Sequence, residues 1–396
     1  VLEEDQQKIR LVVEELEDKM KSPKKLGLEL ASLNSMLRLL NTGTTDDEVD
    51  SLEEYIAPTL VKLDSQGKSS MSDVMLTISE KLNESSGRPF SEAEVANLMI
   101  CTQQNLLTIL HGRPGVGKTS TAIKLAKFMG LEGDEAKGSS NFLNIAVGRG
   151  WMSTRDLIGY YNSLKNMYQP ARTGLYNFLK QGTTVEASDT LRLVLLDEAN
   201  LSPLEHYWSD FIGLCDHEGY NGTINTGIPK GNGSFQVNKN RNLRFIATIN
   251  NDSTTEPLSP RLLDRAPVIS MDIPDDNGMN SGVILEEMTG ALPLSFLEKN
   301  LGTIRKAAES VNEDEDGLYT ILEEMIKIAK APDPDFGEQI EISPRRYSAV
   351  NRYVSTAAIY MEDHVATDFA IAQFLLPLIA GDQSGFILRL QEMQKY

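Results

Sequence analysis

One stretch constrains what this chain can fold into more than any other: residues 111–120, which read HGRPGVGKTS. An apolar run over 105–110 precedes it and a helical pattern over 121–128 follows it, so we expect a strand, a tight loop and a helix. Residues 112–119 have the G-x-x-x-x-G-K-S/T spacing of a phosphate-binding loop. Glycines let backbone N–H groups wrap closely around a polyphosphate, because no Cβ atom stands in the way. The sequence therefore predicts a nucleotide site in this loop.

The same loop supplies the candidate cofactor-binding residues. We expect Lys118 to reach the β- and γ-phosphate oxygens, and the Thr119 hydroxyl to hold Mg²⁺. The helix that follows would turn its positive end toward the β-phosphate. A glycine-rich turn that matches by chance is the alternative, and the strand before the loop and the helix after it argue against that reading. The candidate nucleotide-binding residues are Gly112, Pro114, Gly115, Gly117, Lys118, Thr119 and Ser120.

Composition narrows the class of protein. The chain has 396 residues, enough for about two or three domains. Its net charge of −19 argues against nucleic-acid binding over the whole surface, and leaves open a local basic lining in an assembled ring. Cys101 and Cys215 are too few for a disulfide framework or a cysteine metal site. No apolar run reaches about 18 residues and no signal sequence is visible, so we expect a cytoplasmic protein that contacts no membrane.

Hydrophobic periodicity divides the chain into three expected domains. Residues 1–84 follow helical spacing, so we expect an N-terminal all-helical domain, either partner-binding or a plain bundle without activity. The polar stretch 83–89 is the best boundary in the chain. Alternating strands and helices predict an α/β core over 85–275. The pattern after it is helical, and we expect a helical lid over 276–396.

The expected strands of the core are uniformly apolar. Strands of this kind are buried on both faces, which indicates a parallel sheet covered by helices. The expected strands are 106–110, 142–147, 191–196, 243–249 and 268–271. The expected helices are 71–82, one capped at Ser91, and lid segments near 281–290, 294–310, 316–330, 344–361 and 365–379.

Two of these strands end in polar side chains. Asp197 and Glu198 follow one strand, where an Asp can serve the Mg²⁺ shell and a Glu can polarise an attacking water. Asn250 follows another, where it could orient that water or contact the γ-phosphate, although Asn is common after strands. Solvated acids at a strand end are the alternative, and the neighbouring phosphate loop makes it the weaker one.

Arginines at two places are candidates for stabilising phosphate charge. Arg261 and Arg265 lie four residues apart before the last strand, on one expected helical face. Acting in trans, such an arginine would neutralise charge at the γ-phosphate of a neighbouring subunit. Arg345 or Arg346 begins a lid helix after Pro344 and could reach back over the nucleotide. Salt-bridged surface arginines and helix capping are the alternatives.

In their order and spacing, these motifs resemble those of an AAA+ ATPase over about residues 91–360. The resemblance is carried by 112–119, 197–198, 248–250, 258–265 and 343–345. The segment 151–176 looks like the helix-2 insert of the MoxR, dynein-related and McrB branch, and 197–202 looks like that branch's acidic strand end. The chain is most similar to the McrB-like ATPases.

The resemblance implies a role for each matched residue, a cofactor and an assembly. It implies an AAA+ P-loop NTPase core that binds ATP, or GTP, with Mg²⁺; ATP is favoured because no Asn-Lys-x-Asp motif is present. It also implies a homo-oligomer, a hexameric ring in which the next subunit completes each site. The implied roles are phosphate binding for Lys118, metal binding for Thr119 and Asp197, catalytic base for Glu198, sensor 1 for Asn250, arginine finger for Arg265 with Arg261 as a second candidate, and sensor 2 for Arg345.

Two inserts would face the pore of such a ring. Residues 219–237 are rich in Gly and Asn and predict a hairpin, and 151–176 is the other insert. Tyr160, Tyr161 and Tyr168 could grip a polymer or a partner there, and aromatic packing within the insert is the favoured alternative for at least some of them.

We therefore expect a ring-forming ATPase that remodels a protein partner or drives a partner nuclease, as McrB-like proteins do. A nucleotide-gated scaffold with slow hydrolysis and a MoxR-type chaperone are the alternatives. A monomeric P-loop kinase is disfavoured, because it would leave the arginine pair and the long helical lid without a role. The sequence names neither the substrate nor the partner.

Overall fold

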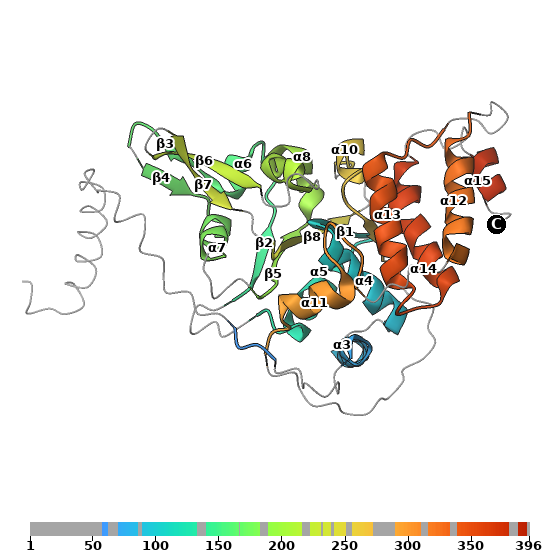
Figure 1. Cartoon of the computed structure of the whole chain (residues 1–396). Coiled ribbons are helices and arrows are strands. Elements are labelled where there is room, and N and C mark those ends of the chain that lie inside the picture. The colour runs from blue at the N-terminus through green and yellow to red at the C-terminus, as the bar shows by residue number, and fades with distance from the viewer. Residues whose placement is uncertain are drawn as a thin grey trace, which may run out of the picture. The chain divides into compact units, whose positions relative to one another are not determined.

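A computed structural model describes most of the chain beyond residue 57 (Figure 1). The helices predicted within residues 1–57 lie outside the described residues, as does most of the one predicted over 281–290. The described residues are 58–61, 70–85, 89–132, 140–165, 167–182, 189–215, 222–230, 233–238, 241–250, 256–271, 290–309, 316–332, 339–379 and 387–393.

The chain divides into two compact units. One comprises Val1–Leu52 with Asn162–Met167, and the other comprises Glu53–Tyr161 with Tyr168–Tyr396. The second unit holds every candidate site residue and is the one described below.

A five-stranded parallel sheet forms the centre of this unit, in the order β2-β5-β8-β1-β9. Each strand coincides within a few residues with one of the expected apolar segments, so the prediction of an α/β fold built on a parallel sheet is confirmed. The strands are β1 (Leu107–Gly112), β2 (Phe142–Ala146), β5 (Arg192–Asp197), β8 (Leu243–Asn250) and β9 (Val268–Ser270).

The strands are apolar on both faces because the sheet separates two hydrophobic clusters. Along β5, Leu193 and Leu195 belong to one cluster, and Val194 and Leu196 belong to the other. Successive side chains of a strand point to opposite faces, so both faces of β5 are covered. The first cluster includes side chains of α3 (Met71–Ser85), α4 (Glu92–Gln104) and α5 (Lys118–Phe128), and the second those of α7 (Leu175–Gln181), α8 (Leu204–Tyr207) and α9 (Ser209–Ile212).

Helix α3 lies close to its expected position, but it shares a core with the α/β unit. Val74, Ile78 and Leu82 of α3 lie in the same hydrophobic cluster as buried residues of α4 and α5. The helix therefore packs as part of this unit, although the sequence pattern groups it with the N-terminal helices.

The C-terminal region is helical, and in Figure 1 helices α12 to α15 gather at the side of the sheet away from β2. The prediction of one helix over 294–310 is wrong beyond Leu301, because Gly302 has a left-handed φ of 78° that ends α11. The helices are α11 (Leu294–Leu301), α12 (Asp316–Lys330), α13 (Pro344–Ala357), α14 (Asp363–Ala370), a π turn at Ile371–Leu375, a 3-10 turn at Leu376–Leu378, and α15 (Ile387–Met393).

Two hairpins extend from the core. The predicted hairpin within 219–237 is confirmed: β6 (Thr223–Lys230) pairs antiparallel with β7 (Gly233–Asn238). In the 151–176 insert, the short helix α6 (Thr154–Leu157) is followed by β3 (Gly159–Asn162), which pairs with β4 (Met167–Pro170). One further short helix, α10 (Pro260–Leu263), precedes β9.

The predicted helix start at Ser91 is confirmed in detail. The Glu94 backbone N–H donates to Ser91 Oγ at 3.1 Å, and the Ser91 N–H donates to Glu94 Oε2 at 2.9 Å. This capping box satisfies two backbone donors that would otherwise lack a partner at the start of α4.

Ser91→Ala is expected to lower the free energy of unfolding by about 1 kcal/mol, because it removes the N-cap oxygen of α4. Urea denaturation followed by circular dichroism measures the change. Ser91→Asp retains a capping oxygen and should stay near wild type. Equal losses in both variants would contradict a capping role.

Candidate functional site

The glycine-rich loop joins β1 to α5, as the sequence predicts. Gly115 and Gly117 have φ values of 86° and 89°, in the left-handed region that favours glycine, and Gly117 is the N-cap of α5. A Cβ atom added to either residue would meet nothing within 4 Å, so the space beside the loop is open. The loop thus has the backbone conformation and the room that an anion would need at the start of a helix.

Gly112 is required for a different reason. A Cβ atom on Gly112 would lie 2.3 Å from the backbone oxygen of Met271, the residue that follows β9. The Met271 N–H also donates to the His111 carbonyl at 2.7 Å. Any larger residue at position 112 would push these two strand ends apart.

Lys118 lies inside the loop. Its Nζ donates to the carbonyls of Gly112 at 2.8 Å and Arg113 at 2.9 Å, and the residue is only 6% exposed. Burial lowers the pKa of Lys118, while the nearby charges of Asp197 and Glu198 act to raise it. An ammonium group held between backbone carbonyls is ready to exchange them for phosphate oxygens.

Asp197, the last residue of β5, accepts hydrogen bonds from two threonine hydroxyls at the carboxyl edge of the sheet. Its Oδ1 accepts from Thr119 Oγ1 at 2.5 Å and from Thr248 Oγ1 at 2.7 Å. Thr119 and Asp197, the predicted metal ligands, are 78 residues apart in sequence. The fold therefore brings the predicted pair into contact.

This pair of oxygen donors fits Mg²⁺ that is bound together with a phosphate. Mg²⁺ prefers oxygen ligands and is commonly held by one or two protein groups plus phosphates and water. Within the described ranges, no group of three or more His, Cys, Asp or Glu side chains could hold a metal by themselves. Thr119 and Asp197 offer two such oxygens beside the glycine-rich loop.

Glu198 has an unusual backbone. Its φ of 52° and ψ of 44° lie in the left-handed region, and it is the one non-glycine residue with positive φ among those that the structure describes. Its backbone N–H donates to Thr248 Oγ1 at 2.9 Å, and its side chain is exposed. Strained residues of this kind cluster at functional sites, which supports Glu198 as a candidate catalytic residue.

Asn250 ends β8 and lies next to the loop. In the register of the sheet it pairs with Gly112. The side chain of Asn200 clasps its backbone: Nδ2 donates to the Asn250 carbonyl at 2.8 Å, and Oδ1 accepts from the Asn250 N–H at 3.2 Å. The carboxyl edge of the sheet thus unites the loop, both acids and Asn250.

Thr248 and Asn200 are members of this site to which the sequence analysis assigns no role. Thr248 lies two residues before Asn250 on one strand, so both side chains leave the same face of the sheet. That spacing is the signal that could have identified Thr248. Asn200 offers no comparable signal, because its partner is the backbone of a distant strand end.

Arg265 lies at the amino edge of the sheet, where the parallel strands begin, opposite the carboxyl edge that holds the loop. Ile109 pairs with Val268, so Arg265 is level with the start of β1, whereas the glycine-rich loop follows the end of β1. Its Nη1 donates to the Arg261 carbonyl at 3.0 Å and lies 4.0 Å from Asp264 Oδ2. The side chain is 14% exposed and Arg261 is exposed. Arg265 therefore does not lie beside the loop of its own chain.

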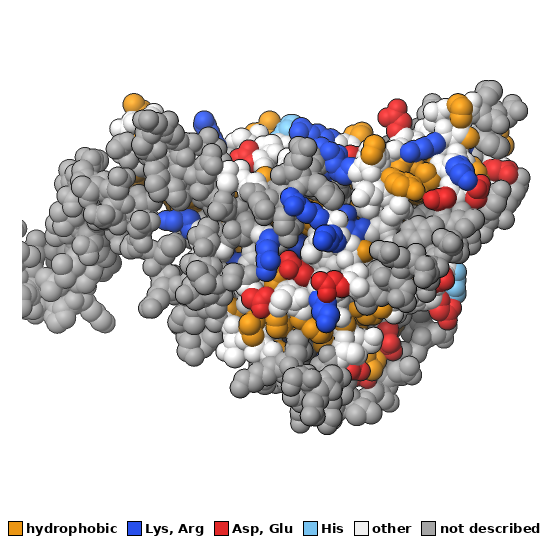
Figure 2. Space-filling model, viewed as in Figure 1, with side chains coloured by type: hydrophobic (Ala, Val, Ile, Leu, Met, Phe, Trp, Pro, Cys, Tyr) orange, Lys and Arg blue, Asp and Glu red, His pale blue; other side chains and the backbone are white. Residues whose placement is uncertain are grey.

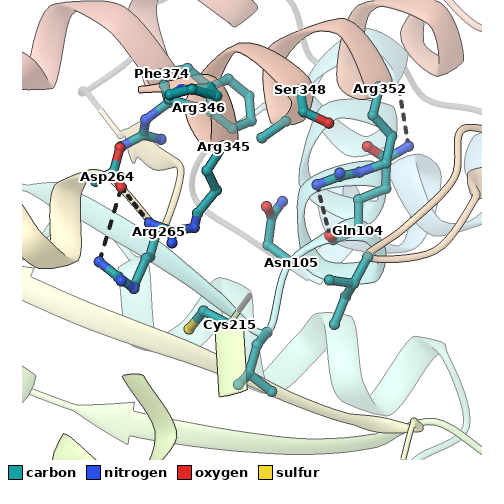
Figure 3. Close-up of a pocket in the computed structure, with 14 residues that line it drawn as sticks. Gln104, Asn105, Cys215, Asp264, Arg265, Arg345, Arg346, Ser348, Arg352 and Phe374 are labelled. Atoms are coloured by element: carbon teal, nitrogen blue, oxygen red, sulfur yellow. Dashed lines mark hydrogen bonds and ion pairs between the residues drawn. The ribbon is translucent and has the colours of Figure 1, made fainter. Parts of the chain in front are cut away.

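Arg345 joins Arg265 at this amino edge (Figure 3). Its Nη1 donates to Asp264 Oδ2 at 2.7 Å, and Ser343 Oγ donates to Asp264 Oδ1 at 2.5 Å. The structure therefore places Arg345 away from Thr119 and Asp197, and the expectation that it reaches back over the nucleotide of its own chain gains no support. Ser343 also caps α13, since its side chain accepts from the Arg346 backbone N–H.

A cavity of about 440 Å³ opens between these residues (Figure 3). Asp264 is the one acidic residue among its lining residues, beside four arginines: Arg265, Arg345, Arg346 and Arg352. In Figure 2, Lys and Arg side chains also gather on the middle of the described face, although the chain is acidic overall. This amino-edge arginine cavity is thus suited to an anionic group.

Arg346, which follows Arg345 in α13, is buried and holds this helix against the core. Arg346 is 1% exposed, donates to the Ala266 carbonyl at 3.2 Å and lies over the ring of Phe374. Burial lowers its pKa to about 10. Arg346 fastens α13 to the core, which leaves the more exposed Arg345 as the candidate for phosphate contact.

The tyrosines of the 151–176 insert differ in exposure. Tyr168 is 8% exposed and stacks on Tyr176, with ring centroids 4.2 Å apart. Tyr160 is 39% exposed, and Arg155 lies over its ring at 5.5 Å. Packing within the insert therefore accounts for Tyr168, whereas Tyr160 is accessible to a ligand.

A known family model matches the C-terminal region. Residues 296–396 match the model of a domain of unknown function (DUF8727). This match covers most of α11 and all of α12 to α15, and includes Arg345, but neither the glycine-rich loop nor the acids of β5. No curated protein matches the chain. None of the helices that the structure describes is long and apolar enough to cross a membrane.

Glu198→Gly is expected to be more stable than Glu198→Ala by about 1 kcal/mol, because a Cβ atom disfavours the left-handed conformation by about 1–2 kcal/mol. Thermal or urea unfolding of both variants measures the difference. Alanine is the control, since it removes the carboxylate but keeps the Cβ atom. Equal stability of the two variants would contradict backbone strain at this position.

Proposed function

We propose that this chain is a nucleoside triphosphatase of the AAA+ type, most similar to McrB-like ATPases. The observation that carries the proposal is the contact between Thr119 and Asp197 beside an open glycine-rich loop. A threonine hydroxyl after the loop lysine and an aspartate at the end of another strand of the sheet are the two protein oxygens that Mg²⁺-nucleotide sites of this kind use.

The strand arrangement supports the same proposal. Strand β8 lies between β1, which leads into the loop, and β5, which ends in the acids. Asn250 at the end of β8 is therefore held between the phosphate-binding and acidic parts of the site. This is the position from which a sensor-1 residue could contact both the γ-phosphate and the attacking water.

Hydrolysis would use the residues of this edge in distinct roles. Lys118 and the N-terminus of α5 bind the β- and γ-phosphates, and Thr119 with Asp197 hold Mg²⁺, which neutralises phosphate charge when bound. The Glu198 carboxylate accepts a proton as water attacks the γ-phosphorus, and the bond to the β-phosphate oxygen breaks. Asn250 orients the water.

The arginines support an assembly of several subunits. Arg265 and Arg345 share Asp264 at the amino edge, whereas the loop lies at the carboxyl edge. One chain cannot use this pair at its own loop without a large rearrangement, but a second copy can present the pair to it. We propose a homo-oligomeric ring, hexameric as the family resemblance implies, with ATP or GTP between subunits and an unidentified protein partner, such as a nuclease subunit.

A nucleotide-gated scaffold is the second candidate function. The observation in its favour is that Asp264 already engages both Arg265 and Arg345 within the chain. Arginines that stay bound to Asp264 would leave hydrolysis slow even when nucleotide drives assembly.

Lys118→Ala is expected to abolish triphosphate binding, because it removes the buried ammonium group of the loop. Lys124→Ala is the matched control, since Lys124 lies on the same helix and bonds to the Ser85 carbonyl outside the loop. Glu198→Gln should retain binding and lower kcat by about 10²–10⁴-fold. Titration with a fluorescent nucleotide measures binding, and phosphate release measures kcat. Unchanged nucleotide binding by Lys118→Ala would contradict a nucleotide site in this loop.

Arg265→Ala and Arg345→Ala should each lower hydrolysis, by as much as about 10³–10⁵-fold for an arginine finger, without loss of nucleotide binding. Arg261→Ala should do less, because the Arg261 atom that accepts from Arg265 is its backbone carbonyl, which the substitution keeps. Mixing Arg265→Ala subunits with Glu198→Gln subunits should restore turnover. The particle mass of the wild-type chain should rise when a non-hydrolysable ATP or GTP analogue is added, which would show assembly. Absence of rescue at every ratio would exclude action between subunits.

A further inference from the structure

We propose that Thr248 is a positioning residue of the metal-nucleotide site: its hydroxyl holds the carboxylate of Asp197 and the backbone of Glu198 in their working arrangement. This inference rests on the proposed function. Thr248 would touch neither nucleotide nor metal, and would act through the two acids.

The hydrogen bonds of Thr248 fix the direction of its own proton. Its Oγ1 accepts from the Glu198 N–H at 2.9 Å and donates to Asp197 Oδ1 at 2.7 Å. A backbone N–H can only donate, so the hydroxyl proton is free for the carboxylate. The hydroxyl therefore presents a hydrogen-bond donor to Asp197 and holds one of its carboxylate oxygens in place.

Thr248 is rigidly placed. It is 1% exposed, on the strand that lies between the other two strands of the site. It pairs with Leu110 of β1, and the preceding Ala247 pairs with Leu196 of β5. A side chain held between two buried strands can set the position of the acids more precisely than one in a loop.

Asp197 depends on Thr248 most when metal is bound. In the structure, Oδ1 accepts from both Thr119 and Thr248. If the Thr119 hydroxyl serves Mg²⁺ as a ligand, Thr248 still holds this carboxylate oxygen. Partners that orient a metal ligand in this way typically change metal affinity by about 10–100-fold when they are removed.

Glu198 depends on Thr248 through its backbone. A left-handed non-glycine residue persists only where its surroundings hold it, and the N–H of Glu198 is bonded to Thr248 Oγ1. Loss of the hydroxyl would remove the acceptor of that N–H. Both acids would then lose a restraint from a single substitution.

A purely structural role predicts different behaviour, and Thr108 is the control that separates the two. Thr108 is fully buried on β1, the adjacent strand, and its Oγ1 donates to the Cys101 carbonyl at 3.0 Å. Thr108→Val therefore removes an equally buried hydroxyl from the same sheet without touching either acid.

The experiment compares the wild-type chain with Thr248→Val, Thr248→Ser and Thr108→Val. Binding of a fluorescent, non-hydrolysable ATP analogue is titrated in EDTA and again with increasing Mg²⁺. In Thr248→Val, binding in EDTA should match wild type, while the Mg²⁺ concentration for half-maximal binding should rise by about 10–100-fold. Thr248→Ser should restore the wild-type value, and Thr108→Val should keep it. If Thr248→Val does not fold, Thr248→Ala takes its place.

Wild-type Mg²⁺ dependence in Thr248→Val would overturn the inference while leaving the proposed function intact. An equal shift in Thr108→Val would also overturn it, because the effect would then follow from losing any buried hydroxyl. A wild-type chain that binds the ATP and GTP analogues no better than Lys118→Ala would refute the proposed function itself, and this inference with it.

Discussion

The carboxylate of Asp197 is the point on which the site depends. It accepts one hydrogen bond from the hydroxyl of Thr119, at the start of a helix, and another from the hydroxyl of Thr248, on the central strand of the sheet. These contacts require β5, β8 and β1 to lie side by side in one register. Packing of both faces of the sheet holds that register, because a shift by one residue would exchange the side chains that face the two hydrophobic clusters.

The second organising feature is the distance between two clusters of charge. Lys118 and the acids lie at the carboxyl edge of the sheet, whereas Arg265 and Arg345 lie with Asp264 at the amino edge. A parallel sheet keeps its two edges apart by the length of its strands. Within one chain, Arg265 and Arg345 therefore lie apart from the glycine-rich loop.

Sequence periodicity predicted the architecture better than the placement of single side chains. The apolar strands, the hairpin within 219–237 and the helix start at Ser91 depend on local patterns, and the structure agrees with them. The helix expected over 294–310 ends at Leu301. The hydrophobic period continues past Gly302, but the backbone of Gly302 is not helical. The family resemblance implies a sensor-2 role for Arg345 over the nucleotide, whereas in the structure Arg345 donates to Asp264, a residue on a distant segment.

By itself, the sequence determined that a glycine-rich loop stands between a strand and a helix, because spacing and backbone freedom are local properties. It also determined that the strands are buried on both faces. Only the tertiary structure decided that Thr248 and Asn200 belong to the site and that the arginines lie at the far edge. Those facts depend on strand order and register, which arise from packing between segments distant in sequence. The spacing of Thr248 and Asn250 places both on one face of a strand, but it does not say which strand lies beside them.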